Sequence, residues 1–283
     1  MRNVSLPRTL NDLWQILRDE PRSILYAGGT DLLVKMRSGL IQPHHLVCLE
    51  RIDELKAVED REEEIFIGSC TTFTKLLQSP LIRKHFPVLI NGLKILGSPP
   101  LRNMATIGGN IVTASPAGDT LPPLHVLRAE LELKRRDSSR RVPIRDFFRG
   151  PGETILTPGE VLTAIWLKKC SDFDLHHYEK VGQRKALAIA VVSLAALLRV
   201  SDGGIVKEAR LAWGSVAPTV VTSAEVEAIL IGNRLSRQVL EKAAQLARTI
   251  VKPIDDLRAS ADYRRQVAGN LLLRLGLKHG KTS

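Results

Sequence analysis

The stretch "ILYAGGTDLL", residues 24–33, places two glycines between an apolar strand pattern and a run with helical spacing. Gly28 and Gly29 have no Cβ atom, so the backbone can turn sharply there and approach a ligand closely. The pattern predicts a short helix from Thr30, and the first amide N–H groups of a helix have no partner within it and favour a bound phosphate. A tight strand–helix turn without a ligand is the alternative, and this stretch alone leaves both interpretations open.

A second segment, "TIGGNIVTASPAGD" at residues 106–119, repeats this chemistry. It offers a hydroxyl at Thr106, bare backbone at Gly108 and Gly109, and a side-chain amide at Asn110. Two such loops fit the two phosphates of a pyrophosphate group. Neither loop has the G-x-G-x-x-G spacing of a Rossmann dinucleotide site or the G-x-x-x-x-G-K-S/T spacing of a P-loop, so both of those sites are disfavoured.

The composition is that of a globular chain long enough for two domains. Of its 283 residues, 44% are hydrophobic and 25% are charged. The N-terminal residues lack the apolar stretch of a signal peptide, and the longest apolar run, at 186–198, is shorter than the ~20 residues that span a bilayer. We therefore expect a cytoplasmic location, no membrane span and a buried strand in that run.

The formal net charge of +11 raises the question of a nucleic-acid partner. The basic residues are spread along the chain, with the densest run at 134–141, and only 4% of the residues are aromatic and able to stack on bases. A basic face for an acidic protein partner explains the charge with fewer assumptions. We expect no nucleic-acid partner.

Metal chemistry has no clear sequence signal. The cysteines form no C-x-x-C pair, which disfavours a zinc or iron–sulfur site and fits a reducing compartment: Cys48, Cys70 and Cys170. The pairs His44-His45 and His176-His177 would point to opposite faces of a strand and have no third ligand nearby. We expect no metal site. The tryptophans lie in apolar patterns and are predicted to be core residues: Trp14, Trp166 and Trp213.

The apolar pattern predicts an α+β fold of two domains. Thr9, with Asp12 three residues later, is a predicted N-cap of the first helix. Domain 1–171 combines a small β-α-β unit with a mixed α/β unit whose strands lie near 64–70, around the polar turn 134–141 and at 160–167. Domain 172–283 begins with a long antiparallel hairpin. Three helices are predicted after it, near 223–231, 236–250 and 260–277.

Three segments together resemble a known family. They are "AGGTDLL" at 27–33, "RNMATIGGNIVTASPAGD" at 102–119 and "YEKVGQRKALAIA" at 178–190. They are similar to the FAD-binding medium subunit of molybdenum hydroxylases, the group of xanthine dehydrogenase and the aerobic carbon monoxide dehydrogenase flavoprotein. The resemblance continues to "DDLRASADYRRQVAGNLLLRL" at 255–275 and so covers nearly the whole chain.

The resemblance implies a set of FAD-binding residues. Two segments would hold the pyrophosphate largely through backbone N–H groups, with added side-chain bonds from Thr30, Thr106 and Asn110. Asp119 would bond FAD hydroxyls, although it could simply cap a turn. The full set is Leu25, Tyr26, Ala27, Gly28, Gly29, Thr30, Asp31, Leu32, Leu96, Thr106, Ile107, Gly108, Gly109, Asn110, Asp119, Leu162 and Lys180.

Three members of this set are implied to lie near the flavin ring. Lys180 would place a cation close to the cofactor and favour the negatively charged reduced flavin, although a solvated surface charge is the alternative. The chain at Leu162 would run beside the isoalloxazine ring. Leu96 stands where xanthine dehydrogenases carry an aromatic residue, and this departure leaves the flavin-facing wall undefined.

The resemblance also implies a function and partners. FAD would be the only redox group, because three isolated cysteines cannot supply an extra iron–sulfur cluster. The chain would receive electrons one at a time from a small [2Fe–2S] subunit and pass them in pairs to NAD⁺, a quinone or oxygen. The substrate would react on a separate large molybdenum subunit, in a dimer of heterotrimers, so we assign no catalytic residue here.

Two other functions stay open at this point. A self-contained flavin oxidase of the covalent-flavin type would normally carry a histidine after the two glycines, where this chain has Thr30. A nucleic-acid-binding protein is the less favoured alternative. Absorbance separates them, because a flavoprotein is yellow and a nucleic-acid-binding protein is not.

Overall fold

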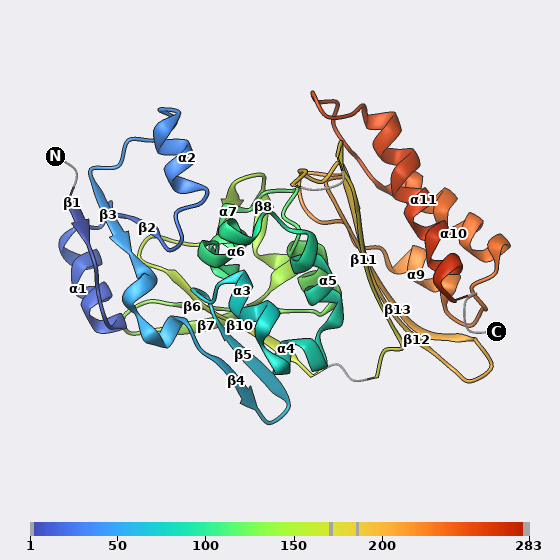
Figure 1. The fold of residues 1–283 in the computed structure, drawn as a ribbon, viewed down its shortest axis with the longest axis horizontal. Coiled ribbons are helices and arrows are strands. Elements are labelled where there is room, and N and C mark those ends of the chain that lie inside the picture. The colour runs from blue at the N-terminus through green and yellow to red at the C-terminus, as the bar shows by residue number, and fades with distance from the viewer. Residues whose placement is uncertain (1–2, 170–171, 185–186, 280–283) are drawn as a thin grey trace. The chain divides into compact units, whose positions relative to one another are not determined.

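The computed structural model describes residues 3–169, 172–184 and 187–279, without the side chains of 277–279. The described residues form two compact units. The N-terminal unit consists of residues 3–83, 97–114 and 128–169. The C-terminal unit consists of 84–96, 115–127 and the described residues from 172 onward. Figure 1 shows the elements in chain order.

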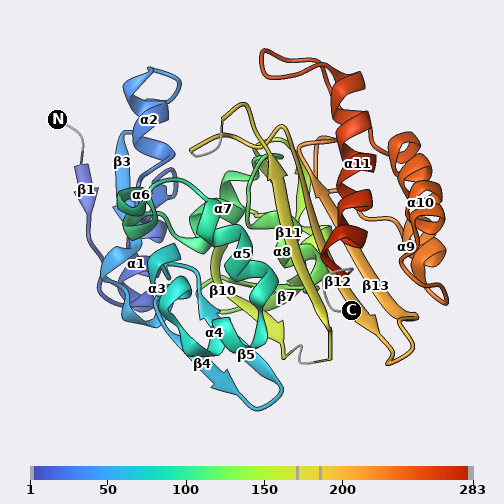
Figure 2. The same cartoon turned by 45° about the vertical axis from the view of Figure 1, so that its right-hand side comes forward.

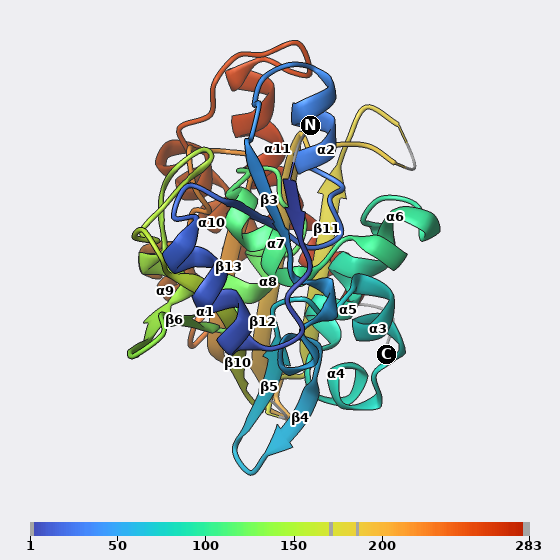
Figure 3. The same cartoon turned by 90° about the vertical axis from the view of Figure 1, so that its left-hand side faces the viewer.

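A small parallel sheet opens the N-terminal unit, with strand order β1-β3-β2 (Figure 1; β3 is also labelled in Figure 3). Its strands are β1 (Asn3–Ser5), β2 (Ile24–Tyr26) and β3 (His45–Cys48). Helix α1 (Leu10–Asp19) begins after Thr9, whose side chain forms the predicted capping box with Asp12. The predicted β-α-β unit is confirmed, and the short strand β1 is an addition to it.

Helix α2 (Leu32–Arg37) follows the first glycine turn and begins two residues later than the predicted start at Thr30. None of its residues is buried, and the side chains of Leu33 and Val34 are largely exposed. The apolar residues of α2 therefore do not pack into the core of the unit.

A five-stranded antiparallel sheet with order β4-β5-β10-β6-β7 forms the larger part of the N-terminal unit. Its strands are β4 (Val58–Arg61), β5 (Glu64–Gly68), β6 (Glu130–Lys134), β7 (Ser139–Pro143) and β10 (Val161–Lys168). All but β4 follow the predicted strands. The remaining elements here are η1 (Leu49–Arg51), η2 (Asp53–Leu55), α3 (Phe73–Gln78), α6 (Pro99–Met104), α7 (Ile107–Thr113), η3 (Ile144–Asp146), β8 (Phe148–Gly150) and β9 (Glu153–Thr154). Helix α4 (Pro80–His85) begins in this unit and ends in the C-terminal unit.

The C-terminal unit is built on one antiparallel sheet with order β11-β12-β13. Its strands are β11 (Leu175–Val181), β12 (Val192–Val200) and β13 (Val206–Gly214). One face packs against the helices α9 (Ala224–Leu230), α10 (Arg237–Ile250) and α11 (Ala261–His279), around a core that includes Leu194, Trp213 and Leu272 (Figure 2). The hairpin and the three helices are confirmed. The buried strand is confirmed only from Val192, because 187–190 are not strand and residue 186 lies outside the described residues.

The other face of this sheet is covered by two helices from much earlier in the chain, α5 (Pro87–Ile95) and α8 (Leu121–Val126). These segments precede the predicted domain boundary at 171/172, yet they group with the C-terminal sheet. Residue 171 itself lies outside the described residues, as does Cys170.

The tryptophan prediction is right for two positions and wrong for the third. Trp14 and Trp213 are buried. Trp166 is only partly buried, because it lies on an outer face of the five-stranded sheet, where the Arg141 guanidinium stacks 3.7 Å from its ring centroid. Its Nε1–H donates to Glu132 at 2.9 Å. Among the described helices, none is both long and apolar enough to cross a membrane.

Candidate functional site

The first glycine turn fits only residues without a side chain. A Cβ atom on Gly28 would lie 1.9 Å from the carbonyl oxygen of Met104, the last residue of α6. Gly29 has a φ of +67°, in the left-handed region that side chains disfavour. The turn therefore brings the backbone against the residues that directly precede the second glycine segment.

The amide groups of this turn are candidate donors to a ligand. Within the part of the chain that the structure describes, no hydrogen bond leaves the N–H groups of Gly29, Thr30, Asp31 or Leu32. The carbonyl of Gly29, in contrast, accepts from the amide of Leu33 at 2.9 Å. Gly28 and Gly29 are buried, and a buried donor without an acceptor is costly. An anionic ligand fits these donors.

The structure joins the two predicted segments. The Thr113 hydroxyl, at the end of α7, donates to the Asp31 carboxylate at 3.2 Å. The same carboxylate forms an ion pair with Lys35 at 2.7 Å. With the contact of Gly28 to Met104, this bond holds both glycine segments in one region of the N-terminal unit.

The second segment uses its backbone donors inside the protein. The amides of Ile107 and Gly108 donate to the carbonyls of Thr71 and Ser69, at 3.1 and 2.8 Å. The Thr106 hydroxyl caps α7 by accepting from the amide of Gly109 at 3.1 Å, and the Thr106 carbonyl accepts from the amide of Asn110 at 3.0 Å. The expected backbone role is therefore not supported here, and side chains are the groups that this segment can offer to a ligand.

Asp119 and Lys180 form a buried ion pair in the C-terminal unit. The Nζ atom of Lys180 lies 2.6 Å from Oδ2 of Asp119, and the Tyr178 hydroxyl donates to Oδ1 at 2.9 Å. Tyr178 and Lys180 lie two positions apart on β11, so their side chains share one face of the sheet. The alternative of Lys180 as a solvated charge is excluded, because its side chain is 8% exposed.

Burial controls the protonation of this cluster. Removal from water raises the pKa of the Asp119 carboxyl, and this outweighs the opposing effects of the Lys180 ammonium and the Tyr178 hydroxyl. Burial and the neighbouring Asp119 raise the pKa of Tyr178 well above its usual value, so this phenol stays protonated and acts as a donor. Tyr178 was absent from the sequence-based site, although its alternation with Lys180 was a usable signal.

The two leucines of the predicted site are both buried. Leu162 lies on β10 beside an irregularity in its pairing with β6, in the N-terminal unit. Leu96 follows the last residue of α5, in the C-terminal unit, where Asp119 and Lys180 also lie. The glycine segments lie in the N-terminal unit.

His45 and His176 have hydrogen-bond partners and Cys48 and Cys70 are buried, whereas His44 is exposed. Both ring nitrogens of His45 hydrogen-bond serine hydroxyls, at Ser5 and Ser23, each at 2.8 Å. His176 Nε2 lies 3.0 Å from the carbonyl oxygen of Phe173. Burial raises the pKa of the Cys70 thiol to about 12. Over the described residues, no group of three or more His, Cys, Asp or Glu side chains is placed to bind a metal ion.

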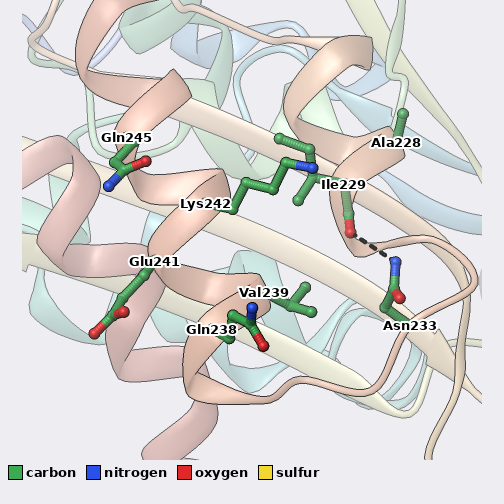
Figure 4. A pocket seen from close by; sticks show the side chains of 8 residues that line it. All are labelled: Ala228, Ile229, Asn233, Gln238, Val239, Glu241, Lys242 and Gln245. Carbon is green, nitrogen blue, oxygen red and sulfur yellow. Dashed lines mark hydrogen bonds between the residues drawn. The ribbon is translucent and has the colours of Figure 1, made fainter.

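A surface hollow between α9 and α10 has a volume of about 670 Å³ and contains none of the predicted site residues (Figure 4). Its lining is aliphatic, amide and charged: Ala228, Ile229, Asn233, Gln238, Val239, Glu241, Lys242 and Gln245. The Asn233 amide donates to the carbonyl of Ile229 at 3.2 Å across one edge. These helices pack on the sheet face opposite to Lys180, so we assign this hollow no role at the site.

Comparison with known families identifies this arrangement as that of a flavin-binding subunit. Residues 1–167 match the model of the FAD binding domain in molybdopterin dehydrogenase, and residues 177–278 match that of the CO dehydrogenase flavoprotein C-terminal domain. The chain belongs to the FAD-binding medium subunits of the molybdenum hydroxylases, and its cofactor is FAD.

Individual relatives cover nearly the full chain. The chain is 33% identical to a putative xanthine dehydrogenase FAD-binding subunit of Escherichia coli, over 90% of this chain and 88% of the relative. It is also 33% identical to the carbon monoxide dehydrogenase medium chain of Hydrogenophaga pseudoflava, over 88% and 86%. The solved structure of quinoline 2-oxidoreductase from Pseudomonas putida superposes with a TM-score of 0.94 at 26% identity, over 100% of this chain and 99% of that one.

Proposed function

We propose that this chain is the electron-transfer subunit of a molybdenum hydroxylase complex. It accepts electrons from [2Fe–2S] clusters on a small partner subunit and delivers them through FAD to NAD⁺, a quinone or oxygen. FAD supplies the conversion between one-electron and two-electron transfer. The single observation that carries the proposal is the joined pair of glycine segments: Gly28 lies against Met104, Asp31 is bonded to Thr113, and the amides from Gly29 to Leu32 have no acceptor among the described residues.

The residues of the N-terminal unit would hold the pyrophosphate. The four amides from Gly29 to Leu32 point donors at the anion, as other glycine turns do. The side chains of Thr30, Thr106 and Asn110 add polar contacts. Because the amides after Thr106 are already bonded inside the protein, the first segment contributes backbone donors and the second contributes side chains.

The residues of the C-terminal unit would act on the rest of the cofactor. Asp119 would accept hydrogen bonds from FAD hydroxyls, and Lys180 would place its ammonium toward the reduced flavin. Leu96 would lie against the ring and keep water away from it. Since Lys180 is paired with Asp119, the two charges cancel at long range, and their effect on the flavin depends on their orientation.

We propose that the molybdenum and iron–sulfur centres of the complex lie on partner subunits. The names of its relatives as medium chains or FAD-binding subunits support a complex with a large molybdenum subunit and a small [2Fe–2S] subunit. We propose a dimer of such heterotrimers in the cytoplasm. The net charge of +11 would steer docking to an acidic partner face and make assembly sensitive to salt.

The flavin content of the purified chain tests this proposal. We expect a yellow protein that releases one FAD per chain on denaturation and oxidises no organic substrate by itself. A colourless chain that FAD cannot reconstitute would contradict the cofactor site. Turnover of an organic substrate by the isolated chain would favour a self-contained flavin oxidase instead.

A further inference from the structure

We propose that Tyr178 is a positioning residue that orients the Asp119 carboxylate, and through it Lys180, toward FAD. This inference rests on the proposed function, which assigns both charged residues to the cofactor. Tyr178 itself is 7% exposed and would act through Asp119.

The hydrogen bonds of the cluster fix the plane of the carboxylate. Oδ1 of Asp119 accepts from Tyr178 at 2.9 Å, and Oδ2 accepts from Lys180 at 2.6 Å. The Ser193 hydroxyl in turn donates to the Tyr178 oxygen, which directs the phenolic hydrogen to Asp119. A carboxylate oxygen has two acceptor positions, so each oxygen of Asp119 keeps one for a ligand hydroxyl.

Two glycines clear the space that the cluster needs. Strand register places Ser193 directly opposite both Lys180 and Gly214. A Cβ atom on Gly214 would lie 2.5 Å from the Ser193 hydroxyl oxygen. A Cβ atom on Gly92, in α5, would lie 3.1 Å from the Asp119 carbonyl oxygen and 3.7 Å from the Tyr178 ring. These two glycines therefore let α5 and β13 pack close to the side chains of Tyr178 and Ser193.

Tyr178 also contributes, after burial and Lys180, to the pKa of the Asp119 carboxyl. Its hydroxyl stabilises the ionised carboxylate, as does Lys180, against the cost of burial. Loss of this donor would raise the pKa of Asp119 further, and protonation would remove an acceptor and the anionic partner of Lys180. The other titratable side chains on the surrounding elements α5, α8, β11 and β13 are Lys94, His125, His176, His177, Glu179, Lys207, Glu208 and Arg210. His177 and Glu179 alternate with Tyr178 and Lys180 on β11, so they lie on the opposite face of the sheet.

Three of these groups have partners other than Asp119. His125 bonds the carbonyl of Leu121 and His176 that of Phe173, while Arg210 pairs with Glu208. Burial therefore raises the pKa of Asp119, and Lys180 and Tyr178 are the groups that oppose this rise.

The test compares Tyr178→Phe with the wild-type chain. FAD affinity is measured by fluorescence quenching from about pH 5 to about pH 9, a range that spans a raised carboxyl pKa. We expect Tyr178→Phe to bind FAD about tenfold more weakly at neutral pH, because one charge-assisted hydrogen bond is lost. The pH below which affinity falls should move upward. Tyr263→Phe, at a half-exposed position of α11, is the matched control and should leave both quantities unchanged.

Ser193→Ala provides a second variant in case Tyr178→Phe does not fold. It should shift the pH profile in the same direction by a smaller amount, since Tyr178 keeps its bond to Asp119. Wild-type affinity and a wild-type pH profile in the folded variants would overturn the inference and leave Tyr178 a packing residue. Failure of the wild-type chain to bind FAD would be a different result, and it would overturn the proposed function itself.

Discussion

The ammonium of Lys180 lies 2.6 Å from the Asp119 carboxylate, 61 positions earlier in the chain, and both side chains are more than nine-tenths buried. A buried pair of this kind costs desolvation energy that mutual attraction only partly offsets. Its conservative explanation is a structural clamp between β11 and the loop before α8. We propose a second role for it, as a charge pair whose orientation affects the bound FAD.

Lys180→Met should separate these two roles. Removing the cation leaves Asp119 buried and unpaired, which destabilises the chain by about 3–5 kcal/mol. In the flavin-loaded protein, the two-electron reduction potential should fall by an amount equivalent to about 1 kcal/mol, because the reduced anion loses a nearby cation. A spectroelectrochemical titration measures this. The double variant Lys180→Met with Asp119→Asn should regain most of the lost stability. If the reduction potential of Lys180→Met equals that of the wild type, the ion pair has only a structural role.

Gly29→Val together with Gly109→Val should abolish FAD retention. Gly29 has a left-handed φ, and a Cβ atom there would lie 2.9 Å from a methyl of Leu33. Gly109 is exposed, and its Cβ atom would press on the Thr106 hydroxyl at 3.0 Å. Absorbance of the purified variant reports the flavin content, and circular dichroism reports the fold. Gly203→Val, in an open turn between β12 and β13, is the control, and full flavin occupancy of the double variant would remove the two-segment site.

Glu160 should stabilise the N-terminal unit only above acid pH. Its carboxylate forms a two-point bond with Arg140, at 2.8 and 2.9 Å, and accepts from Thr157. The Arg140 bond is the main reason that the pKa of Glu160 is lowered from 4.5 to about 2. Because the folded pKa is the lower one, the stabilisation is present above pH 4.5 and is lost as pH falls toward 2.

Glu160→Gln should therefore lower the free energy of unfolding by about 1 kcal/mol at neutral pH. Near pH 2 the variant and the wild type should have the same free energy of unfolding. Urea unfolding at a series of pH values measures the difference. Glu153→Gln, at an exposed position, should show no such pH dependence. A constant difference between wild type and Glu160→Gln at all pH values would contradict this account.

His125 should make the chain sensitive to mild acid. Burial lowers the pKa of its imidazole from 6.5 to about 4, so the ring is neutral in the fold. Its contribution is present above pH 6.5 and is lost as pH falls toward 4, since the unfolded chain takes up the proton first. We expect a loss of about 3 kcal/mol across this interval. His125→Gln should flatten the pH dependence of unfolding there, whereas the exposed His44→Gln should not.

Local signals predicted much of the fold. The capping box of Thr9 and Asp12, the turn at Gly28 and Gly29, and the hairpin before the three C-terminal helices all depend on residues close in sequence. The strand β1 (Asn3–Ser5) was missed because three residues carry too little periodicity to be recognised. Such short strands form through their neighbours, here the parallel partner β3.

Local sequence patterns could not predict the features that depend on tertiary packing. The helices α5 and α8 group with the C-terminal sheet because Gly92 and Pro122 pack against Tyr178 and Gly214, which no periodicity reveals. The amides after Thr106 looked available for a ligand, but the carbonyls of Ser69 and Thr71 accept them. The site residues themselves came from the family resemblance, since spacing alone predicted a phosphate and not FAD.

The central claim is that this chain is the flavin subunit of a larger redox complex, and the metal and flavin content of that complex tests it most directly. The chain is co-expressed with its genomic neighbours and purified through a tag on this subunit. The account predicts a stable complex that contains molybdenum, iron and FAD, and that dissociates more readily at high salt. A tagged chain that purifies alone from its native host and oxidises an organic substrate unaided would contradict it.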